Sequence, residues 1–276
     1  MRPVSAAGKV VAISGAARGI GFATAGHLHD LGAKVAIGDV DEAAVQAAGS
    51  RLGLPVYRTV DVTDSSSFTA FLDDVEHRLG PVDVLVNNAG VIAVGNAIDE
   101  ADGITRRLLE VNVYGVILGT KLAARRMLPR GRGHVINIAS LSSVTPTVGI
   151  ATYSATKHAV LGYTDAVRLE NRASGVHFSA VLPTLTNTEM IAGVNQPKAF
   201  NNAEPEDVAR AVARLIAKPK PRVIVPRVVG TVTVAQRVLP QRVFERLERV
   251  VGAERIFGAD VDAAQRRGYA KRSGTS

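Results

Sequence analysis

A tyrosine and a lysine lie four positions apart in the stretch TYSATKHAV, residues 152–160, of a chain that contains only five tyrosines. On a helix, this spacing places Tyr153 and Lys157 one turn apart on the same face. An ammonium group beside a phenol favours the phenolate, and lowering the phenol pKa by about three units toward neutral pH takes about 4 kcal/mol. The pair could therefore exchange a proton with a substrate, although such a pair taken alone is usually a surface contact.

Three glycines, at positions 15, 19 and 21, follow a short apolar run in SGAARGIGFATAGHL, residues 14–28. Glycines let the backbone turn tightly and approach a pyrophosphate, whose charge is stabilised by the N-terminus of the helix that begins near Gly19. The alternative is a turn in which the glycines serve geometry alone. Their position after a first strand favours a nucleotide-binding loop.

An acidic residue, Asp39, ends the second apolar run in IGDVDE, residues 37–42. An acid at this position can hydrogen-bond both hydroxyls of an adenosine ribose and repels a 2′-phosphate, which favours NAD over NADP. Arg18 argues partly the other way, because an arginine beside the ribose can hold a 2′-phosphate. The role of capping the next helix fits Asp41 better than Asp39.

Short apolar runs rich in valine and isoleucine alternate with longer helical patterns along the chain. The strands are expected at residues 9–14, 34–38, 55–60, 82–87, 134–139, 176–182 and 222–226. The helices are expected at residues 19–31, 41–52, 64–79, 99–128, 151–174 and 205–217, with Asp64 and Pro205 as start signals. Strands that are apolar throughout suit a parallel sheet buried on both faces, so the pattern predicts a single doubly wound α/β domain.

Composition excludes several classes of site. The chain has 276 residues and no cysteine, which excludes disulfides, thiolate metal sites and a cysteine nucleophile and fits a cytoplasmic protein. Its six histidines form no ligand pattern, since His27 and His29 point to different faces of a helix, and we expect no metal site. The sequence contains no run of 18 consecutive apolar residues, so we expect no membrane-spanning helix.

Seven short motifs follow one another in the order and at the spacing of the short-chain dehydrogenases/reductases, which the chain resembles over roughly residues 8–228. They are SGAARGIG at 14–21, DVTD at 61–64, NNAG at 87–90, VNVYG at 111–115, INIAS at 136–140, YSATK at 153–157 and LPTLTNT at 182–188. Any one of these motifs is weak evidence. Together they imply a Rossmann-type fold with a seven-stranded parallel sheet, and an oxidoreductase that moves hydride between a nicotinamide cofactor and a carbonyl or alcohol.

The resemblance also implies roles for individual residues. The catalytic group falls on Asn112, Ser140, Tyr153 and Lys157, with Tyr153 exchanging the proton, Ser140 bonding the substrate oxygen and Asn112 fixing a water. Asn112 lies within a helical pattern although asparagine is a poor helix former, a conflict that a functional site tends to produce. The implied cofactor contacts are Gly15, Arg18, Gly19, Ile20, Gly21, Asp39, Asp61, Val62, Asn88, Ala89, Gly90, Tyr153, Lys157, Pro183, Thr186 and Thr188. Thr184 replaces the glycine that usually follows the proline at 183, which makes the backbone path there less certain.

In this family three segments form the substrate pocket: the loop after the fourth strand, the segment before the catalytic tyrosine and the stretch after the sixth strand. Here these segments carry mostly apolar residues and little fixed charge. Those residues are Val91, Ile92, Val94, Leu141, Val144, Val148, Met190, Ile191, Val194 and Phe200. Such a lining predicts a lipophilic secondary alcohol or ketone, such as a steroid, a retinoid or a fatty-chain carbonyl, over a sugar or a phosphorylated metabolite.

The positive charge is confined to the last quarter of the chain. Residues 1–205 hold 18 basic and 18 acidic residues, whereas residues 206–276 hold 15 and 7, so the whole net charge of +8 arises there. We expect a catalytic domain at 1–228 and a basic extension at 229–276, with an amphipathic helix in LPQRVFERLERVVG and a mobile end in KRSGTS. The extension could pack on the protein itself, on another subunit or on an anionic membrane surface, whereas nucleic-acid binding is not expected because it has almost no aromatic residue.

The leading hypothesis is therefore an NAD-dependent alcohol dehydrogenase or ketone reductase with a small lipophilic substrate. The alternatives are an NADP-dependent carbonyl reductase and a non-catalytic nucleotide-binding sensor on the same fold. Family likeness implies a homodimer or homotetramer. We expect a cytoplasmic protein, with peripheral membrane contact open through the extension.

Overall fold

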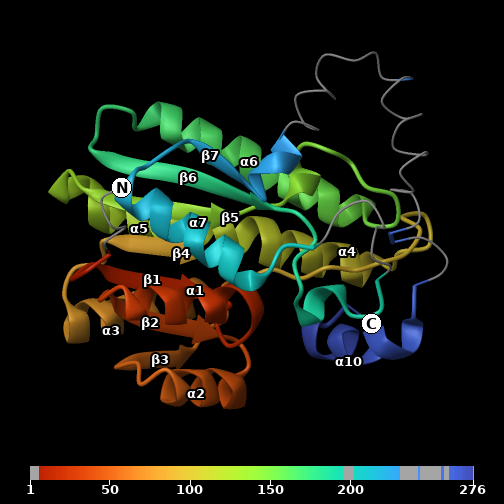
Figure 1. Ribbon diagram of the computed structural model, residues 1–276, viewed down its shortest axis with the longest axis horizontal. Coiled ribbons are helices and arrows are strands. Elements are labelled where there is room, and N and C mark those ends of the chain that lie inside the picture. Colours follow the sequence, from red (N-terminus) through yellow and green to blue (C-terminus); the bar gives the residue numbers. More distant parts are fainter. Residues whose placement is uncertain (1–5, 195–201, 231–241, 243–255, 258–260, 276) are drawn as a thin grey trace.

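A computed structural model describes residues 6–194, 202–230, 242, 256–257 and 261–275. Seven strands form one sheet in the order β3-β2-β1-β4-β5-β6-β7, and every neighbouring pair is parallel (Figure 1). The strands are β1 Val10–Ser14, β2 Lys34–Asp39, β3 Val56–Thr59, β4 Val84–Asn87, β5 Gly133–Ile138, β6 Val176–Pro183 and β7 Arg222–Val225. The seven-stranded doubly wound sheet predicted from the apolar runs is confirmed.

Helices connect the strands and cover both faces of the sheet. The α-helices are α1 Gly19–Asp30, α2 Glu42–Arg51, α3 Ser65–Leu79, α4 Asp102–Leu109, α5 Gly115–Met127, α6 Ala151–Glu170, α7 Pro205–Ala217 and α10 Ala263–Ser273. A π-helical turn spans Glu110–Tyr114, and short 3₁₀ turns span Leu128–Arg130, Leu141–Ser143, Glu189–Ile191 and Arg227–Val229.

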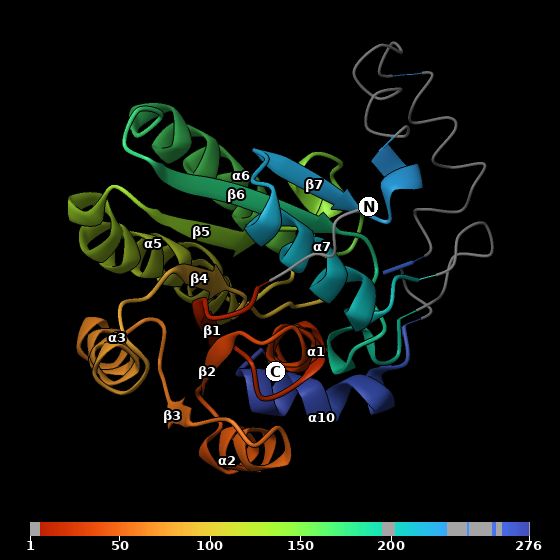
Figure 2. The same ribbon diagram turned by 60° about the vertical axis from the view of Figure 1, so that its left-hand side comes forward.

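Helices lie on both faces of the sheet (Figure 2), and a layer of buried side chains packs between the helices and each face. On one face, Leu28 of α1 and Val212 of α7 pack with sheet residues such as Ile13. On the other face, Phe68 and Phe71 of α3 pack with residues of β1, β4 and α5. Because each fully buried side chain of this size contributes about 1.5–3 kcal/mol, these layers fix the ends of the strands, where the candidate site lies.

Local capping agrees with the start signals in the sequence. The Asp64 carboxylate accepts hydrogen bonds from the backbone N–H groups of Ser66 and Ser67, and Pro205 occupies the first turn of α7. The Asp41 carboxylate accepts the N–H of Ala44 and caps α2, as expected. In contrast, α1 has no side-chain cap at its N-terminus.

The single long helix expected at residues 99–128 is wrong. The segment consists of α4, the π-helical turn and α5, and Asn112 lies within the π-helical turn. A π-turn is common at functional sites because it inserts one extra residue and redirects the side chains around it. Asn112 is fully buried there, which the pattern of a regular amphipathic helix did not predict.

The described part of the expected extension returns to the body of the protein. Helix α10, shown in blue, lies on the side of the molecule where the strands end (Figure 1). Residues 271–273, part of the end predicted to be mobile, complete α10, and Thr275 is 7% exposed. The amphipathic helix predicted in residues 239–252 lies outside the described residues, apart from residue 242. Among the described residues, no helix has the length and apolar character needed to cross a membrane.

Candidate functional site

A cavity of about 900 Å³ opens at the carboxyl ends of the parallel strands. Its walls include residues that lie at or directly after β1, β2, β4, β5 and β6, namely Gly15, Asp39, Asn88, Ser140 and Pro183. Ligands of open α/β sheets bind at this edge, because the loops that follow the strands converge there. The fold therefore brings together residues that are up to 168 positions apart in the sequence, from Gly15 to Pro183.

The loop between β1 and α1 has the geometry of an anion-binding turn. Gly15 has a φ of +64°, and a Cβ atom added to it would lie 2.5 Å from the Cα atom of Ala89. Gly19 also has a positive φ, +54°, and begins α1, whose first N–H groups have no side-chain cap. Uncapped N–H groups at the positive end of a helix dipole attract a phosphate, so this loop fits a dinucleotide.

The loop between β1 and α1 is held close to the end of β4, the strand that lies beside β1 in the sheet. The Asn88 amide donates to the carbonyl oxygens of Gly15 at 2.6 Å and of Ser14 at 3.2 Å. Gly21 lies beneath this contact, and a Cβ atom there would lie 2.4 Å from the Gly15 oxygen and 2.6 Å from Asn88 Nδ2. Gly21 does not line the cavity; its part is to let α1 start directly under the loop.

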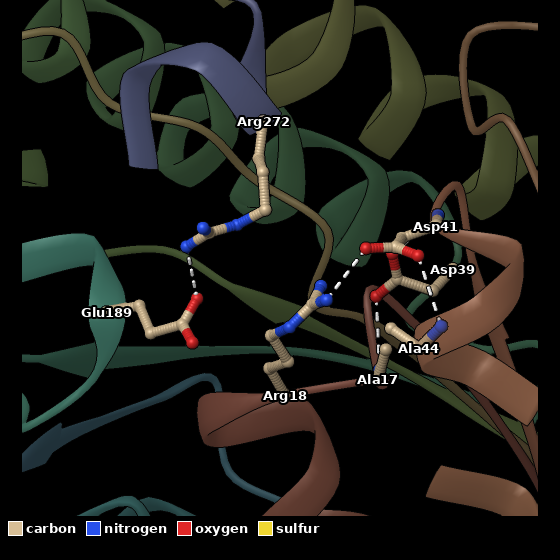
Figure 3. Close-up of polar contacts among 7 residues, drawn as sticks. All are labelled: Ala17, Arg18, Asp39, Asp41, Ala44, Glu189 and Arg272. Atoms are coloured by element: carbon tan, nitrogen blue, oxygen red, sulfur yellow. Dashed lines mark hydrogen bonds and ion pairs between the residues drawn. The ribbon is translucent and has the colours of Figure 1, made fainter. Parts of the chain in front are cut away.

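Two carboxylates, Asp39 and Asp41, lie beside this loop, close to Arg18 (Figure 3). The Asp39 carboxylate accepts the backbone N–H of Ala17 at 3.0 Å and that of Asp41 at 3.2 Å, which fixes it at the end of β2 facing the cavity. Arg18 pairs with Asp41 at 2.7 Å. The sequence allowed Arg18 to hold a 2′-phosphate. In the structure its guanidinium is paired with the Asp41 carboxylate.

Three of the four predicted catalytic side chains meet in the cavity. Tyr153 and Lys157 project from α6, and Ser140 follows β5; all three line the cavity. Ser140 acts on the Tyr153 phenol as a hydrogen-bond partner that lowers its pKa. The Lys157 ammonium donates to the carbonyl oxygen of Ile138 at 3.0 Å and lies 5.5 Å from the centroid of the Tyr153 ring.

The near-neutral phenol pKa expected from the neighbouring Lys157 is not found in this structure, because burial dominates. Burial raises the pKa of Tyr153 to about 12, and the hydrogen bond from Ser140 opposes that rise. Burial also lowers the pKa of Lys157 to about 8, because the ammonium loses water. At neutral pH the phenol therefore keeps its proton and the lysine stays mostly charged, an arrangement that is ready to donate a proton from Tyr153.

Asn112, the fourth predicted catalytic residue, lies behind the cavity wall. Its Oδ1 accepts the N–H of Val91 at 2.8 Å, and its Nδ2 donates to the Val91 carbonyl at 2.9 Å and to the Thr156 hydroxyl at 3.1 Å. Both amide hydrogens are thus donated to the protein, and a water can bind this side chain only through Oδ1. Through these bonds Asn112 holds the backbone of Val91 in place on the cavity wall.

The other predicted cofactor contacts all line the same cavity. Those residues are Arg18, Ile20, Asp61, Val62, Ala89, Gly90, Thr186 and Thr188. The Thr186 hydroxyl, however, donates to the Thr184 carbonyl at 3.0 Å, which ties it to its own loop.

The predicted substrate-pocket residues divide between the cavity and its supports. Those that line the cavity are Val91, Ile92, Leu141, Val148, Met190 and Ile191. Val94 and Val194 pack behind it in the cluster around Tyr153, and Val144 packs against the cluster of α6 and β6. Phe200 lies outside the described residues.

Sequence reasoning missed the part of the cavity wall contributed by the C-terminal region. Ile256, Phe257, Tyr269, Arg272 and Ser273 all line the cavity. Nothing in their spacing indicates this position, since it depends on where α10 packs. Arg272 pairs with Glu189 at 2.7 Å near Arg18 (Figure 3).

Comparisons with known proteins agree on one family. A family model described as short chain dehydrogenase matches residues 9–199. The 3-alpha-(or 20-beta)-hydroxysteroid dehydrogenase of Mycobacterium bovis is 37% identical over 213 residues, which cover 75% of this chain and 82% of that protein. The cis-4-hydroxycyclohexanecarboxylate dehydrogenase of Sinomonas cyclohexanicum is 35% identical over 224 residues, which cover 75% of this chain and 88% of that protein.

A solved structure shows the same architecture. The short chain dehydrogenase/reductase from Burkholderia phymatum, determined in complex with NAD, superimposes with a TM-score of 0.77 at 26% sequence identity. The superposition covers 84% of this chain and 93% of that one. Helix α10 lies beyond the residues that the family model matches.

Proposed function

Because this chain belongs to the short-chain dehydrogenase family, whose members here include named alcohol dehydrogenases, we propose that it transfers hydride between NAD and a lipophilic secondary alcohol or ketone. One observation carries the proposal. A phenol, a serine hydroxyl and a buried lysine converge in an apolar cavity that also contains an uncapped helix N-terminus and the carboxylate of Asp39.

In the proposed reaction Tyr153 handles the proton. NAD, when bound, supplies the hydride acceptor for the hydrogen on the carbinol carbon. Tyr153 takes the hydroxyl proton in alcohol oxidation, and in ketone reduction the phenol returns a proton to the same oxygen. Ser140 donates a hydrogen bond to that oxygen as charge develops on it, and the charged Lys157 favours the phenolate in the oxidative direction. Asn112 holds the Val91 backbone that faces the substrate.

The cofactor preference rests on Asp39. Its carboxylate is fixed by the N–H groups of Ala17 and Asp41 and faces the cavity, where it would accept hydrogen bonds from the adenosine ribose. A 2′-phosphate would bring like charge against this carboxylate, which costs several kcal/mol. Arg18, the residue that could hold a 2′-phosphate, is paired with Asp41; because this pair is partly exposed, it opposes that role only weakly, and the preference depends mainly on Asp39.

Replacing Asp39 with asparagine is expected to lower the ratio of kcat/KM with NAD to kcat/KM with NADP by about tenfold to a hundredfold, because the shape is kept and the repulsion is lost. Steady-state rates with both cofactors at a fixed alcohol concentration measure the ratio. The control is Glu42→Gln, in the first turn of α2, which does not line the cavity and should leave the ratio unchanged. A wild-type enzyme that prefers NADP would contradict the assignment.

The substrate class follows from the lining of the cavity and from the names of the relatives. Around Ser140 and Tyr153, the cavity wall consists mostly of aliphatic side chains such as those of Val91, Ile92 and Met190. The two named relatives act on hydroxysteroids and on a hydroxycyclohexanecarboxylate, and both names denote cyclic alcohols. A panel of lipophilic alcohols and ketones, read by the absorbance of the reduced cofactor with NAD and NADP, tests the class; a preference for sugars or phosphorylated metabolites would overturn it.

Replacing Ser140 with alanine is expected to move the rising limb of the pH profile for alcohol oxidation to higher pH. The Ser140 hydrogen bond lowers the pKa of Tyr153, so its loss leaves the raising effect of burial unopposed and delays ionisation. We also expect kcat to fall by about a hundredfold, because a hydrogen bond to the reacting oxygen is lost.

The profiles of kcat/KM between pH 7 and 12, a range that includes the rising limb set by Tyr153, measure the Ser140 effect. The matched control is Ser154→Ala, a buried serine next to Tyr153 whose hydroxyl has no hydrogen-bond partner among the described residues. Its profile should overlay the wild-type profile. A Ser140 variant whose rising limb stays in place would show that this hydroxyl does not act on the phenol.

Family members are commonly oligomeric, and we propose a homodimer or homotetramer here. Three large apolar side chains support a contact over α4–α6: Leu109, Tyr114 and Leu169 are 46%, 49% and 55% exposed. Light scattering in solution tests the oligomeric state. Membrane contact through residues 239–252 stays a prediction from the sequence.

A further inference from the structure

The C-terminal segment makes contact with all three loops that surround the reacting end of the cavity. At the loop after β4, the Tyr269 phenol oxygen accepts the N–H of Ile92 at 3.1 Å, and the Thr275 hydroxyl donates to the carbonyl of Ile92 at 3.3 Å. At the loop after β6, the guanidinium of Arg266 donates to the carbonyls of Met190 and Ala192 at 3.2 and 3.3 Å.

Two glycines of the main domain leave room for this segment. A Cβ atom at Gly149, in the loop that leads to α6, would lie 2.1 Å from the carbonyl oxygen of Phe257. A Cβ atom at Gly193, after β6, would lie 2.5 Å from the carbonyl oxygen of Asp262, whose N–H donates to the Gly193 carbonyl at 2.9 Å. Both glycines have a positive φ, +81° and +72°. The backbone of the C-terminal segment thus occupies the space that side chains at these positions would need.

Most of the contacts between the C-terminal segment and the main domain are buried. Phe257 and Arg266 are 6% and 8% exposed, and Phe257 packs in one cluster with Tyr153, Ile92 and Tyr269. The ion pair between Arg272 and Glu189 is about half exposed on both sides, so it contributes little. The buried contacts, and not the ion pair, therefore hold α10 over the cavity.

From these contacts we infer that the described C-terminal residues that line the cavity form the outer wall of the substrate pocket in their own chain, and that the side chains of Phe257 and Tyr269 set the size of substrate accepted opposite Tyr153. Both rings line the cavity and pack in the cluster that contains Tyr153. This inference rests on the proposed function, because it assigns the wall of the same site. It concerns residues that lie beyond the family match at 9–199.

Replacing Tyr269 with alanine tests the wall. The probes are cyclohexanol, with one ring, and a 3α-hydroxysteroid, with four fused rings, both with NAD. Loss of the aromatic ring removes contact with the small alcohol and makes space for the large one. We expect the ratio of kcat/KM for the steroid to kcat/KM for cyclohexanol to rise by about tenfold, the size of effect that a missing apolar contact gives in a pocket. An unchanged ratio in a folded variant would overturn the inference.

Two controls separate the wall from general damage. Tyr269→Phe keeps the ring and loses the hydrogen bonds of the phenol to Ile92 and Ser273, so its ratio should stay within about twofold of the wild type. Lys271→Ala changes an exposed residue of the same helix that does not line the cavity, and should change neither rate.

A second variant covers the case in which Tyr269→Ala does not fold. Gly149→Ala pushes Phe257 away and should raise the same ratio by about threefold or more. Its matched control is Gly53→Ala, which has a similar φ of +62° and nothing within 4 Å, and so carries the backbone strain without the contact. If both glycine variants give the wild-type ratio, the inference fails. If the wild type oxidises neither probe with NAD, the proposed function fails instead.

Discussion

Replacing Tyr153 with phenylalanine is expected to lower kcat by about a thousandfold or more in both directions, because the group that exchanges the proton with the substrate oxygen is removed. The phenylalanine ring keeps the shape of the buried side chain, so the dissociation constant for NAD should change by less than about threefold. Stopped-flow measurement of hydride transfer and fluorescence titration with the cofactor give the two quantities separately.

The control for this prediction is Tyr163→Phe. Tyr163 lies on the same helix, is half-buried and does not line the cavity, so removal of its hydroxyl should leave kcat unchanged. In the wild type, oxidation should speed up with rising pH, because burial raises the pKa of Tyr153 and the base is the ionised form. That dependence should disappear with phenylalanine. A Tyr153 variant that keeps a tenth of the wild-type turnover would rule out the assigned role.

The second large effect is expected from Gly21→Ala. The added methyl group would lie 2.4 Å from the Gly15 carbonyl oxygen and 2.6 Å from the Asn88 amide, so the loop between β1 and α1 must move away from the helix. We expect the dissociation constant for NAD to rise by about a hundredfold, since the N–H groups that would face the pyrophosphate are displaced. The unfolding free energy should fall by about 1–3 kcal/mol from overpacking.

Gly26→Ala gives a matched control for this variant on the same helix. Its methyl group would meet only the end of the Leu52 side chain, at 3.3 Å, and alanine favours a helix over glycine by about 1 kcal/mol. This variant should bind NAD as the wild type does and be at least as stable. Isothermal titration with NAD and chemical denaturation of both variants test the pair. Equal affinities for NAD in the two variants would show that the loop does not need Gly21.

The sheet could be predicted because each strand has a local signal. Runs such as VVAIS in β1 and VLVN in β4 are apolar throughout, and parallel strands buried on both faces require this. The tight turn between β1 and α1 was equally visible, since the positive φ at Gly15 and Gly19 and the close contacts at Gly21 all favour glycine. Asp39, at the end of β2, followed from the position of its strand alone.

Other features depend on tertiary contacts that a local pattern does not contain. The pKa of Tyr153 is raised because α6 is buried, and no spacing along the sequence reports the depth of burial. The π-helical turn around Asn112 looked like a regular helix in the sequence, because one inserted residue hardly changes the periodicity. The wall formed by Phe257 and Tyr269 was missed since its place is decided by packing against Ile92 and Gly149, far away in the chain.

The hydrogen bond between the Thr275 hydroxyl and the Ile92 carbonyl joins residues that are 183 positions apart, and this separation has a consequence for synthesis. At about 5–20 residues per second, a ribosome needs roughly 10–40 seconds to make that interval. The loop that fits the nucleotide emerges early, whereas the outer wall emerges among the last residues. The nascent chain therefore presents its glycine loop well before it can form the outer wall.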